Sequence, residues 1–397
     1  MDRSKALAAA LVSACTASLL APAALACGAM FSSTTSESEI IDMSDQRALL
    51  VSHDGRVDQF VQIAYEGNPS EFAWVYPFPA QPTLEQVRSD LFEQLDEGTR
   101  PRFWITSPSS EDPGCDCLPM MGAGASARGG AGDGIDAGLP VQVWGNGEVG
   151  VFDYVIITAV SVDDMLAWLD DNGFRAPAGA DAVLKHYVDL GWFFVAMRLS
   201  PGTSADEVTA TIRFSYLSDA LTYPLYMSSI SAASDLGVLL YVLAPHRMDA
   251  AGGYATLEIR DRVGVVDETT TNYESQFDGA IAEAGGRAFV VEYANSGTEV
   301  RDMLWGVEGI PDGAGELFLT RLRTVVSAGA YADVPLARAA TDEPVSSTFD
   351  LMYPGVVNAA VGGWALLAGL FSYTLLRGAA RRLAVRRSDR DRAGPVA

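Results

Sequence analysis

An uncharged, mostly apolar run near the C-terminus, Gly355–Leu376, constrains this chain more than any other feature. As a helix its 22 residues would be about 33 Å long, enough to cross a hydrocarbon core of about 30 Å. An arginine-rich tail, residues 377–397, follows the run, and positive residues beside a span mark its cytoplasmic side. The sequence therefore predicts a single-pass membrane protein whose C-terminus is cytoplasmic. The residues expected to orient it are Arg377, Arg381, Arg382, Arg386 and Arg387.

The N-terminus, residues 1–26, has the pattern of a secretory signal peptide. Arg3 and Lys5 form a positive n-region, an apolar stretch follows, and Ala24-Leu25-Ala26 is an A-x-A cleavage site. Cleavage there would leave Cys27 as the first residue, which is either acylated as a lipid anchor or remains a thiol or disulfide partner. Ala24 stands where lipoprotein signals carry a bulky aliphatic residue, so the second fate is favoured.

The two ends together predict a type I membrane protein whose bulk is periplasmic or extracellular. The expected parts are a signal peptide 1–26, an extracytoplasmic domain 27–336, a polar juxtamembrane linker 337–354, a transmembrane helix 355–376 and a cytoplasmic tail 377–397. Within the domain, residues 118–139 are rich in Gly and Ala and have almost no bulky side chains. Such a stretch buries too little apolar surface to offset its ordering entropy, which predicts a flexible loop.

The chain has a formal net charge of −24, and its outer part is more acidic still because the tail is basic. So acidic a surface argues against nucleic acid and against anionic headgroups as direct ligands. It is compatible with divalent cations, with basic partners, or simply with solubility and adaptation to salt.

The periodicity of the outer domain predicts an α+β fold that is strand-rich with inserted helices. Strands are expected in 46–79 and at 103–105, 141–144, 149–160, 191–199, 208–216, 223–231, 236–244 and 254–260. Helices are expected at 83–97, 161–173, 181–190, 273–284, 298–305 and 315–326. Thr83 with Gln86 forms a capping box for the first of these helices, and Ser161 is the N-cap of the second.

Three cysteines remain after the signal: Cys27, Cys115 and Cys117. A disulfide is the usual fate of paired cysteines outside the cytoplasm, so we expect Cys27 to bridge to Cys115 or Cys117. A lone C-x-C with one distant cysteine supplies too few ligands for a metal, and the C-x-x-C of redox proteins is missing. The sequence therefore predicts neither a metal site nor a cofactor.

Familiar catalytic motifs do not occur: there is no G-x-S-x-G, H-E-x-x-H or P-loop pattern. Gly145–Gly150 matches G-x-G-x-x-G, but the β-branched Val151–Val160 follows instead of a helix, which favours a hairpin turn. His53, His186 and His246 have no ligand spacing and are better explained as surface or satisfied core residues. A hydrolase that uses paired carboxylates stays open, although nothing in the sequence selects a pair.

Five stretches of the outer domain are shared with a known family: Cys27-Gly28, Phe72–Pro77, the C-x-C at Cys115–Cys117, Tyr187–Arg198 and Phe214–Leu225. In these stretches the chain resembles the bacterial family catalogued as domain of unknown function 2330. The resemblance covers roughly Cys27 to Val326. It implies an envelope domain that bears cysteines, follows a signal peptide and often precedes a membrane span, and it supplies no catalytic residue.

The sequence thus favours a membrane-anchored extracytoplasmic protein that binds a partner or supports the envelope, rather than an enzyme. Its expected contacts are membrane lipid through the C-terminal helix and an envelope protein, with no nucleic acid. The hydrolase alternative predicts a pocket holding two or more acids with raised pKa values. A structural role predicts an exposed apolar patch instead.

Overall fold

The computed structural model describes residues 24–25, 28–33, 43–65, 72–106, 140–200 and 208–353. Strands account for 47% and helices for 21% of the described residues, which agrees with the prediction of a strand-rich fold. The described residues form two compact units. The large unit takes those within 1–102, 119–263 and 273–349, and the small unit takes those within 103–118, 264–272 and 350–397.

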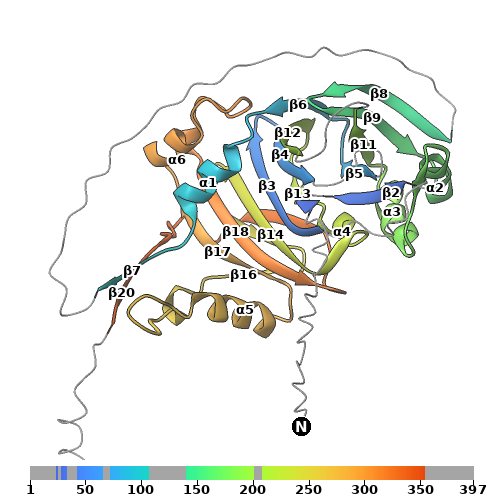
Figure 1. The fold of residues 1–397 in the computed structure, drawn as a ribbon. Coiled ribbons are helices and arrows are strands. Elements are labelled where there is room, and N and C mark those ends of the chain that lie inside the picture. The colour runs from blue at the N-terminus through green and yellow to red at the C-terminus, as the bar shows by residue number, and fades with distance from the viewer. Residues whose placement is uncertain are drawn as a thin grey trace, which may run out of the picture. The chain divides into compact units, whose positions relative to one another are not determined.

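The large unit is built on a nine-stranded sheet with the strand order β16-β17-β18-β14-β3-β1-β4-β12-β6 (Figure 1). Its strands are β1 Ala24–Leu25, β3 Met43–His53, β4 Arg56–Tyr65, β6 Thr83–Val87, β12 Val208–Leu217, β14 Ala232–Ala244, β16 Ala255–Leu257, β17 Ala288–Asn295 and β18 Phe318–Ser327. β14 runs parallel to β3, whereas β12 is antiparallel to both β4 and β6. The two residues of β1 fall in the stretch expected to be signal peptide, and they pair with β3 and β4.

A second sheet of six strands has the order β10-β2-β5-β11-β9-β8 and is antiparallel throughout. Its strands are β2 Ala29–Ser33, β5 Phe72–Phe78, β8 Val141–Val149, β9 Phe152–Ala159, β10 Phe174–Arg175 and β11 Phe193–Leu199. A three-stranded sheet joins β13 Leu221–Tyr223, β19 Val334–Arg338 and β15 Met248–Ala250. A two-stranded sheet pairs β20 Thr348–Met352 with β7 Arg102–Thr106.

Helices cover the outer faces of both large sheets (Figure 1). α2 Val162–Asp171 and α3 Ala180–Asp189 pack on the six-stranded sheet. α1 Leu91–Thr99 and α6 Thr298–Met303 pack on the nine-stranded sheet, and α5 Tyr273–Glu283 contacts its strands β17 and β18. The short pieces are α4 Leu225–Ser228, η1 Arg260–Arg262 and η2 Ala314–Glu316.

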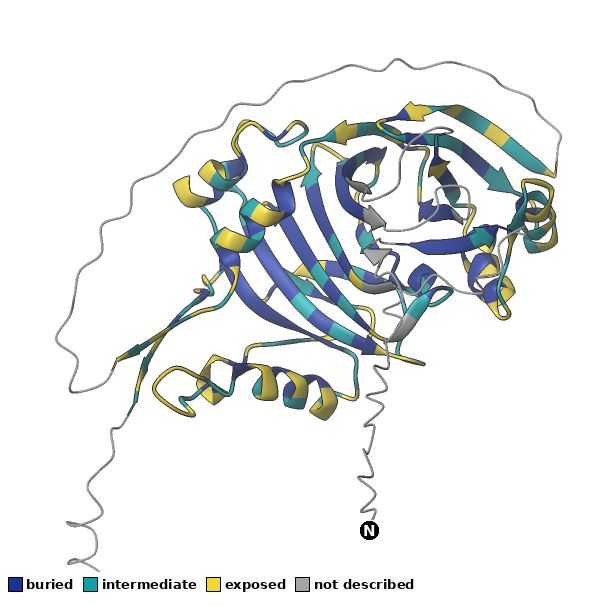
Figure 2. Ribbon diagram, viewed as in Figure 1, coloured by how far each residue is buried: buried dark blue, intermediate teal, exposed yellow. Residues whose placement is uncertain are grey.

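Alternate residues of one strand enter different cores, because successive side chains point to opposite faces of a sheet. On β5, Trp74 and Tyr76 join the core between the two large sheets, whereas Val75 faces the layer of α2 and α3. On β3, Leu50 lies in the shared core and Leu49 faces α1 and α6. The central strands are therefore buried on both faces, as Figure 2 shows for most of their length.

Several elements confirm the sequence predictions. Ser161 caps α2, since its side chain accepts a hydrogen bond from the amide of Asp164 at 3.2 Å. The helices expected at 181–190, 273–284 and 298–305 are α3, α5 and α6. The alternating Val57–Tyr65 lies in β4, and the apolar run Gly191–Leu199 contains β11.

The helix expected at 83–97 is wrong in its first half. Residues Thr83–Val87 form β6, which pairs with β12 from Thr211 to Ser215, and the helix begins only at Leu91. The capping box of Thr83 and Gln86 is therefore absent. Leu84 packs on the shared core as a strand residue, so tertiary pairing overrides the local helical pattern.

The helix expected at 315–326 is also wrong, because these residues form mainly β18. β18 lies between β14 and β17 and pairs with both, which gives its β-branched residues a place in the sheet. The strand expected at 223–231 is largely the short helix α4, and the turn expected at 145–150 lies after β8, at Gly150.

The linker expected at 337–354 is folded over most of its length. Val345 exchanges backbone hydrogen bonds with Ala294, at 2.8 and 2.9 Å, and Phe349 is buried. The large unit extends to Phe349, which is close in sequence to the apolar run that begins at Gly355.

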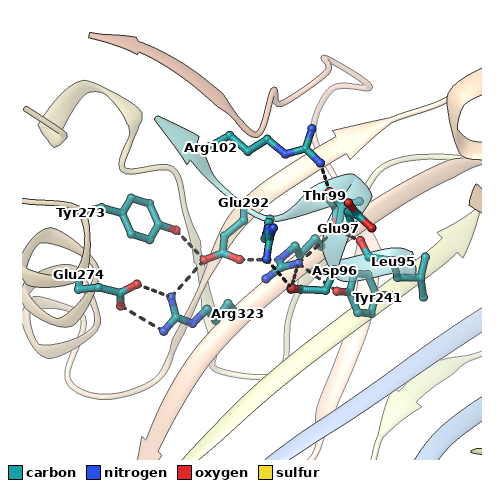
Figure 3. Close-up of polar contacts among 12 residues, drawn as sticks. Leu95, Asp96, Glu97, Thr99, Arg102, Tyr241, Tyr273, Glu274, Glu292 and Arg323 are labelled. Carbon is teal, nitrogen blue, oxygen red and sulfur yellow. Dashed lines mark hydrogen bonds and ion pairs between the residues drawn. The ribbon is translucent and has the colours of Figure 1, made fainter. Parts of the chain in front are cut away.

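A buried network of ion pairs ties β17 and β18 to α1 and α5 (Figure 3). Glu292 is fully buried and accepts hydrogen bonds of 2.6 Å from the Tyr273 hydroxyl and from Arg321 Nε. Arg321 also donates to Asp96 at 2.7 Å, and Arg323 lies 3.5 Å from Glu292. Burial, together with Glu292, raises the pKa of Tyr273 and keeps this donor protonated. These partners compensate the cost of burying the Glu292 carboxylate, which identifies the network as structural.

Replacing Glu292 with Gln would leave Arg321 and Arg323 without their shared buried carboxylate. We expect the Glu292→Gln variant to lose about 3–5 kcal/mol of unfolding free energy, as is typical when one partner of a buried ion pair is removed. Chemical denaturation of the protein measures this loss. The matched control is Glu283→Gln, which breaks an exposed pair with Arg262 and should cost less than about 1 kcal/mol. Equal stability losses in the two variants would contradict a central role for Glu292.

Candidate functional site

A polar cleft of about 390 Å³ opens where β3 turns into β4. The turn is Asp54-Gly55, and both residues have positive φ angles, 49° and 71°. Such angles are those of a type I′ hairpin, for which Asp-Gly is a preferred sequence. The lining residues are His53, Asp54, Arg56, Asp58, Arg213, Ser215, Gly309, Ile310 and Pro311.

Strand register brings the polar side chains of the cleft together. Asp58 on β4 lies directly opposite Ser215 on β12, and Arg213 lies opposite Glu85 on β6. Residues directly opposite each other on antiparallel strands have neighbouring side chains. Each pair forms the contact that its register allows: Ser215 Oγ donates to Asp58, and Arg213 Nη2 donates to Glu85.

Asp58 is the central acceptor of the cleft. Its side chain is 5% exposed, one carboxylate oxygen accepts from Ser215, and the other lies 2.6 Å from His53 Nε2. The second ring nitrogen of His53, Nδ1, lies 3.9 Å from a carboxylate oxygen of the exposed Asp54. Two partners compensate the burial of the Asp58 carboxylate, so this group is held in one place.

The order of these groups does not match a Ser–His–Asp relay. In such a relay histidine stands between serine and aspartate and takes the serine proton. Here Asp58 stands between Ser215 and His53, and each of them is bonded to the carboxylate. The arrangement therefore positions a carboxylate and an imidazole at a cleft wall without activating a serine.

Two arginines provide cationic groups at the cleft. Arg213 is mostly buried, and its Nε is a buried donor without a hydrogen-bond acceptor. Arg56 is half-buried, and no carboxylate of the described residues lies within ion-pair distance of it. Planar guanidinium groups of this kind recognise carboxylates and other oxyanions through paired hydrogen bonds.

Gly309 is required by the position of Arg213. A Cβ at this residue would lie 2.1 Å from Arg213 Nη1, and the φ angle of +88° is itself unfavourable for other residues. The glycine thus lets the loop Gly309–Pro311 close over the arginine. Ile310 and Pro311 give this wall of the cleft an apolar surface.

The structure does not describe the site residues expected from the sequence. Cys27, Cys115 and Cys117 fall outside the described residues, as do the loop 118–139, the apolar run 355–376 and the arginine-rich tail. Within the described part of the chain, no helix has the length and apolar character needed to cross a bilayer.

The three histidines each contact a carboxylate. His53 contacts Asp58, while His186 Nε2 lies 3.1 Å from Asp333 and His246 Nδ1 lies 2.9 Å from Asp342. Among the described residues, no group of three or more metal-ligating side chains comes together. His186 and His246 are satisfied side chains away from the cleft, as the sequence predicted, whereas His53 belongs to the cleft.

Asp249 has the raised pKa that a paired-carboxylate hydrolase needs, but its neighbouring carboxylate, Glu258, is not arranged for catalysis. Burial raises the pKa of Asp249; Arg247 opposes this shift and Glu258 adds to it. Arg247 lies 3.9 Å from Asp249 and donates to Glu258 at 2.6 Å. Its guanidinium contacts both carboxylates, whereas glycoside cleavage requires room for substrate between them.

Most residues of the cleft could not be predicted from the sequence. The turn Asp54-Gly55 was readable as a hairpin signal beside His53, and it was the available clue. Arg213, Ser215 and Asp58 could not be connected to it, because their proximity depends on the register of β12 against β4.

Residues 21–329 match the model of a family described as an uncharacterized protein conserved in bacteria, DUF2330. The chain belongs to the DUF2330 family. The matched range contains every residue of the cleft and ends before β19 and β20. No curated protein matches the sequence.

Among solved structures, this DUF2330 protein is similar to the crystal structure of baculovirus P35. The identity is 11%, and the alignment covers 75% of this chain and 97% of that chain. The TM-score of 0.30 is too low for the similarity to support any conclusion about fold or function.

Substitution of Gly309 tests the packing of the cleft wall. We expect Gly309→Ala to cost about 1–3 kcal/mol of unfolding free energy, because alanine is strained at a φ angle of +88° and its methyl group overlaps the Arg213 side chain. Gly313→Ala is the matched control, since Gly313 has a φ angle of −85° and open space around it. That variant should stay within about 0.5 kcal/mol of the parent in urea denaturation. A neutral Gly309→Ala would mean that Arg213 does not press on the loop.

Proposed function

We propose that this DUF2330 protein is a membrane-anchored extracytoplasmic protein that binds a small polar ligand carrying a carboxylate, and that its cleft is the binding site. The observation that supports the proposal is the pair of arginines, Arg56 and Arg213, at the wall of an open cleft in an acidic chain. Arginine is the usual partner for carboxylates at such sites because its fork of donors matches the two oxygens.

The rest of the cleft suits a compact ligand that is polar on one side and apolar on the other. The exposed Asp54 carboxylate is available to accept hydrogen bonds from hydroxyl or amine groups. Ile310 and Pro311 add an apolar surface to the same cleft. Few well-placed polar groups with an apolar wall are typical of small-molecule sites.

We prefer binding to catalysis because the polar side chains of the cleft form hydrogen bonds with one another. Ser215 and His53 both contact Asp58, so neither is arranged to activate a nucleophile. The hydrolase alternative gains no support from Asp249 and Glu258, which Arg247 bridges.

The anchoring part of the proposal is supported by how close the large unit comes, in sequence, to the apolar run. The large unit extends to Phe349, and an uncharged apolar run long enough to span a bilayer begins at Gly355. The basic residues from Arg377 onward favour a cytoplasmic C-terminus, with the cleft on the outer side of the membrane.

Truncation tests the anchor. We expect a chain that ends at Tyr353 to be released in soluble, folded form, because it lacks the apolar run. The full chain should remain with membranes after washes in high salt and in carbonate. Fractionation followed by thermal denaturation of the released protein measures both properties. A truncated chain that stays with membranes after these washes would point to acylation at Cys27 or to a tight partner.

Substitution of Arg56 tests the cleft. We expect glucuronate or galacturonate, each with one carboxylate, but not glucose or galactose, to raise the melting temperature of the protein. Loss of a hydrogen bond to a charged group is worth about 1.5–3 kcal/mol, so Arg56→Ala should weaken binding of the active carboxylate by roughly 10- to 100-fold.

The matched control is Arg198→Ala, which removes an exposed arginine of β11 outside the cleft and should leave affinity unchanged. Titration calorimetry measures each dissociation constant. Equal binding by the Arg56→Ala variant, or equal stabilisation by the uncharged analogues, would contradict the proposed site.

A further inference from the structure

The small unit carries an unusual share of exposed apolar side chains. Among the described residues, eight large hydrophobic side chains are exposed, and three of them belong to this unit. They are Trp104, Val266 and Met352, with 62%, 64% and 73% of their surface exposed. Exposed tryptophan is costly in water and commonly marks a surface that contacts something else.

Trp104 and Met352 lie on one face of the ribbon formed by β7 and β20. The amide of Arg102 donates to the carbonyl of Ser347, and the amide of Tyr353 donates to the carbonyl of Thr106. From the first hydrogen bond to the second, the residue numbers rise on both strands, so the strands are parallel. This register places Thr106 beside Met352, and Trp104 two residues earlier on the same face.

The opposite face of the ribbon is less exposed. Phe103, Ile105 and Leu351 alternate with the exposed residues and are half-buried. In the described residues the ribbon has only two strands, and two-stranded ribbons are marginally stable unless a surface supports them. The face with Trp104 and Met352 is the side that lacks such a support.

Chain continuity limits where this face can lie. Met352 is three residues before Gly355, so their Cα atoms are at most about 11 Å apart. The headgroup layer on one side of a bilayer is roughly 5–8 Å thick. If Gly355 enters the hydrocarbon core, the end of the ribbon therefore lies in this layer or directly above it.

We infer that the face of the β7–β20 ribbon with Trp104 and Met352 rests in the headgroup layer of the membrane that the C-terminal helix spans. This inference depends on the proposed membrane anchor. Tryptophan is enriched at this depth because its ring is apolar and its N–H is polar. The face also carries Thr106 and Asp350, and such a mixture suits a half-hydrated interface better than the dry centre of a protein complex.

Contact with the membrane at two points, the span and the ribbon, would restrict how the small unit tilts. A single helix joined by a few residues leaves a domain free to pivot. An aromatic anchor on a neighbouring strand removes part of that freedom, because tilt is set by interfacial tryptophan and tyrosine. Tyr353, at the end of β20, lies next to the same layer.

Quenching of tryptophan fluorescence by brominated lipid tests the inference. The full-length protein is reconstituted in phosphatidylcholine vesicles that carry bromine either near the headgroup or near the chain ends. Three variants are compared with the parent: Trp104→Phe in the ribbon, Trp364→Phe in the proposed span, and Trp305→Phe as the control. Trp305 is 76% exposed but belongs to the large unit, so it matches Trp104 in exposure and not in position.

We expect Trp104→Phe to lose the component quenched by shallow bromine and Trp364→Phe to lose the component quenched by deep bromine. Trp305→Phe should retain both. Unchanged shallow quenching in Trp104→Phe, with a loss in Trp364→Phe, overturns the ribbon contact and leaves the anchor in place. Unchanged quenching in both variants overturns the proposed anchor, and the inference with it.

Discussion

The shared core between the two large sheets is the constraint on which the large unit depends. The rings of Trp74, Tyr76 and Phe214 contact one another within it, with centroids 5.3 to 6.3 Å apart. Because helices cover the outer faces, the central strands of both sheets are buried on both sides. Polar groups in these strands must therefore find partners inside the protein, as Gln46 does with Ser228 at 2.8 Å.

This constraint explains where the cleft can form. Along β4, Val57 and Val61 enter the shared core, and unpaired charge has no place beside them. Asp58 lies near the start of β4 and points to the face opposite Val57. Its side chain is 5% exposed and lies 2.6 Å from His53 Nε2. A site at the strand ends uses backbone that the sheet has already fixed, and its side chains are accordingly well positioned.

The sequence correctly predicted elements whose caps and apolar periodicity agree with their packing in the structure. α2 has an N-cap at Ser161 and a single apolar stripe, and both are used. The apolar spacing of Thr83–Val87 and Phe318–Ser327 fits both the helical period and the strand period, so the sequence predicts helices there. The strands that pair with these segments in the sheet are distant in sequence. The site is limited in the same way by pairing between distant segments. Asp54-Gly55 predicts a turn, but the register that pairs Arg213 with Glu85 cannot be predicted from the sequence of either strand.

The acidic surface and the arginines of the cleft act in opposite directions on an anionic ligand. A net charge of −24 repels anions at long range, so electrostatic steering does not favour their approach. Recognition must then come from short-range contacts with Arg56, which is strongest for a compact group with two oxygens. Polyanions would bring further charge against Asp54 and the surrounding acidic surface. Under the proposed function, the two effects together favour a ligand with one carboxylate and otherwise neutral polar groups. The geometry of the cleft, rather than its net charge, would then be the source of specificity.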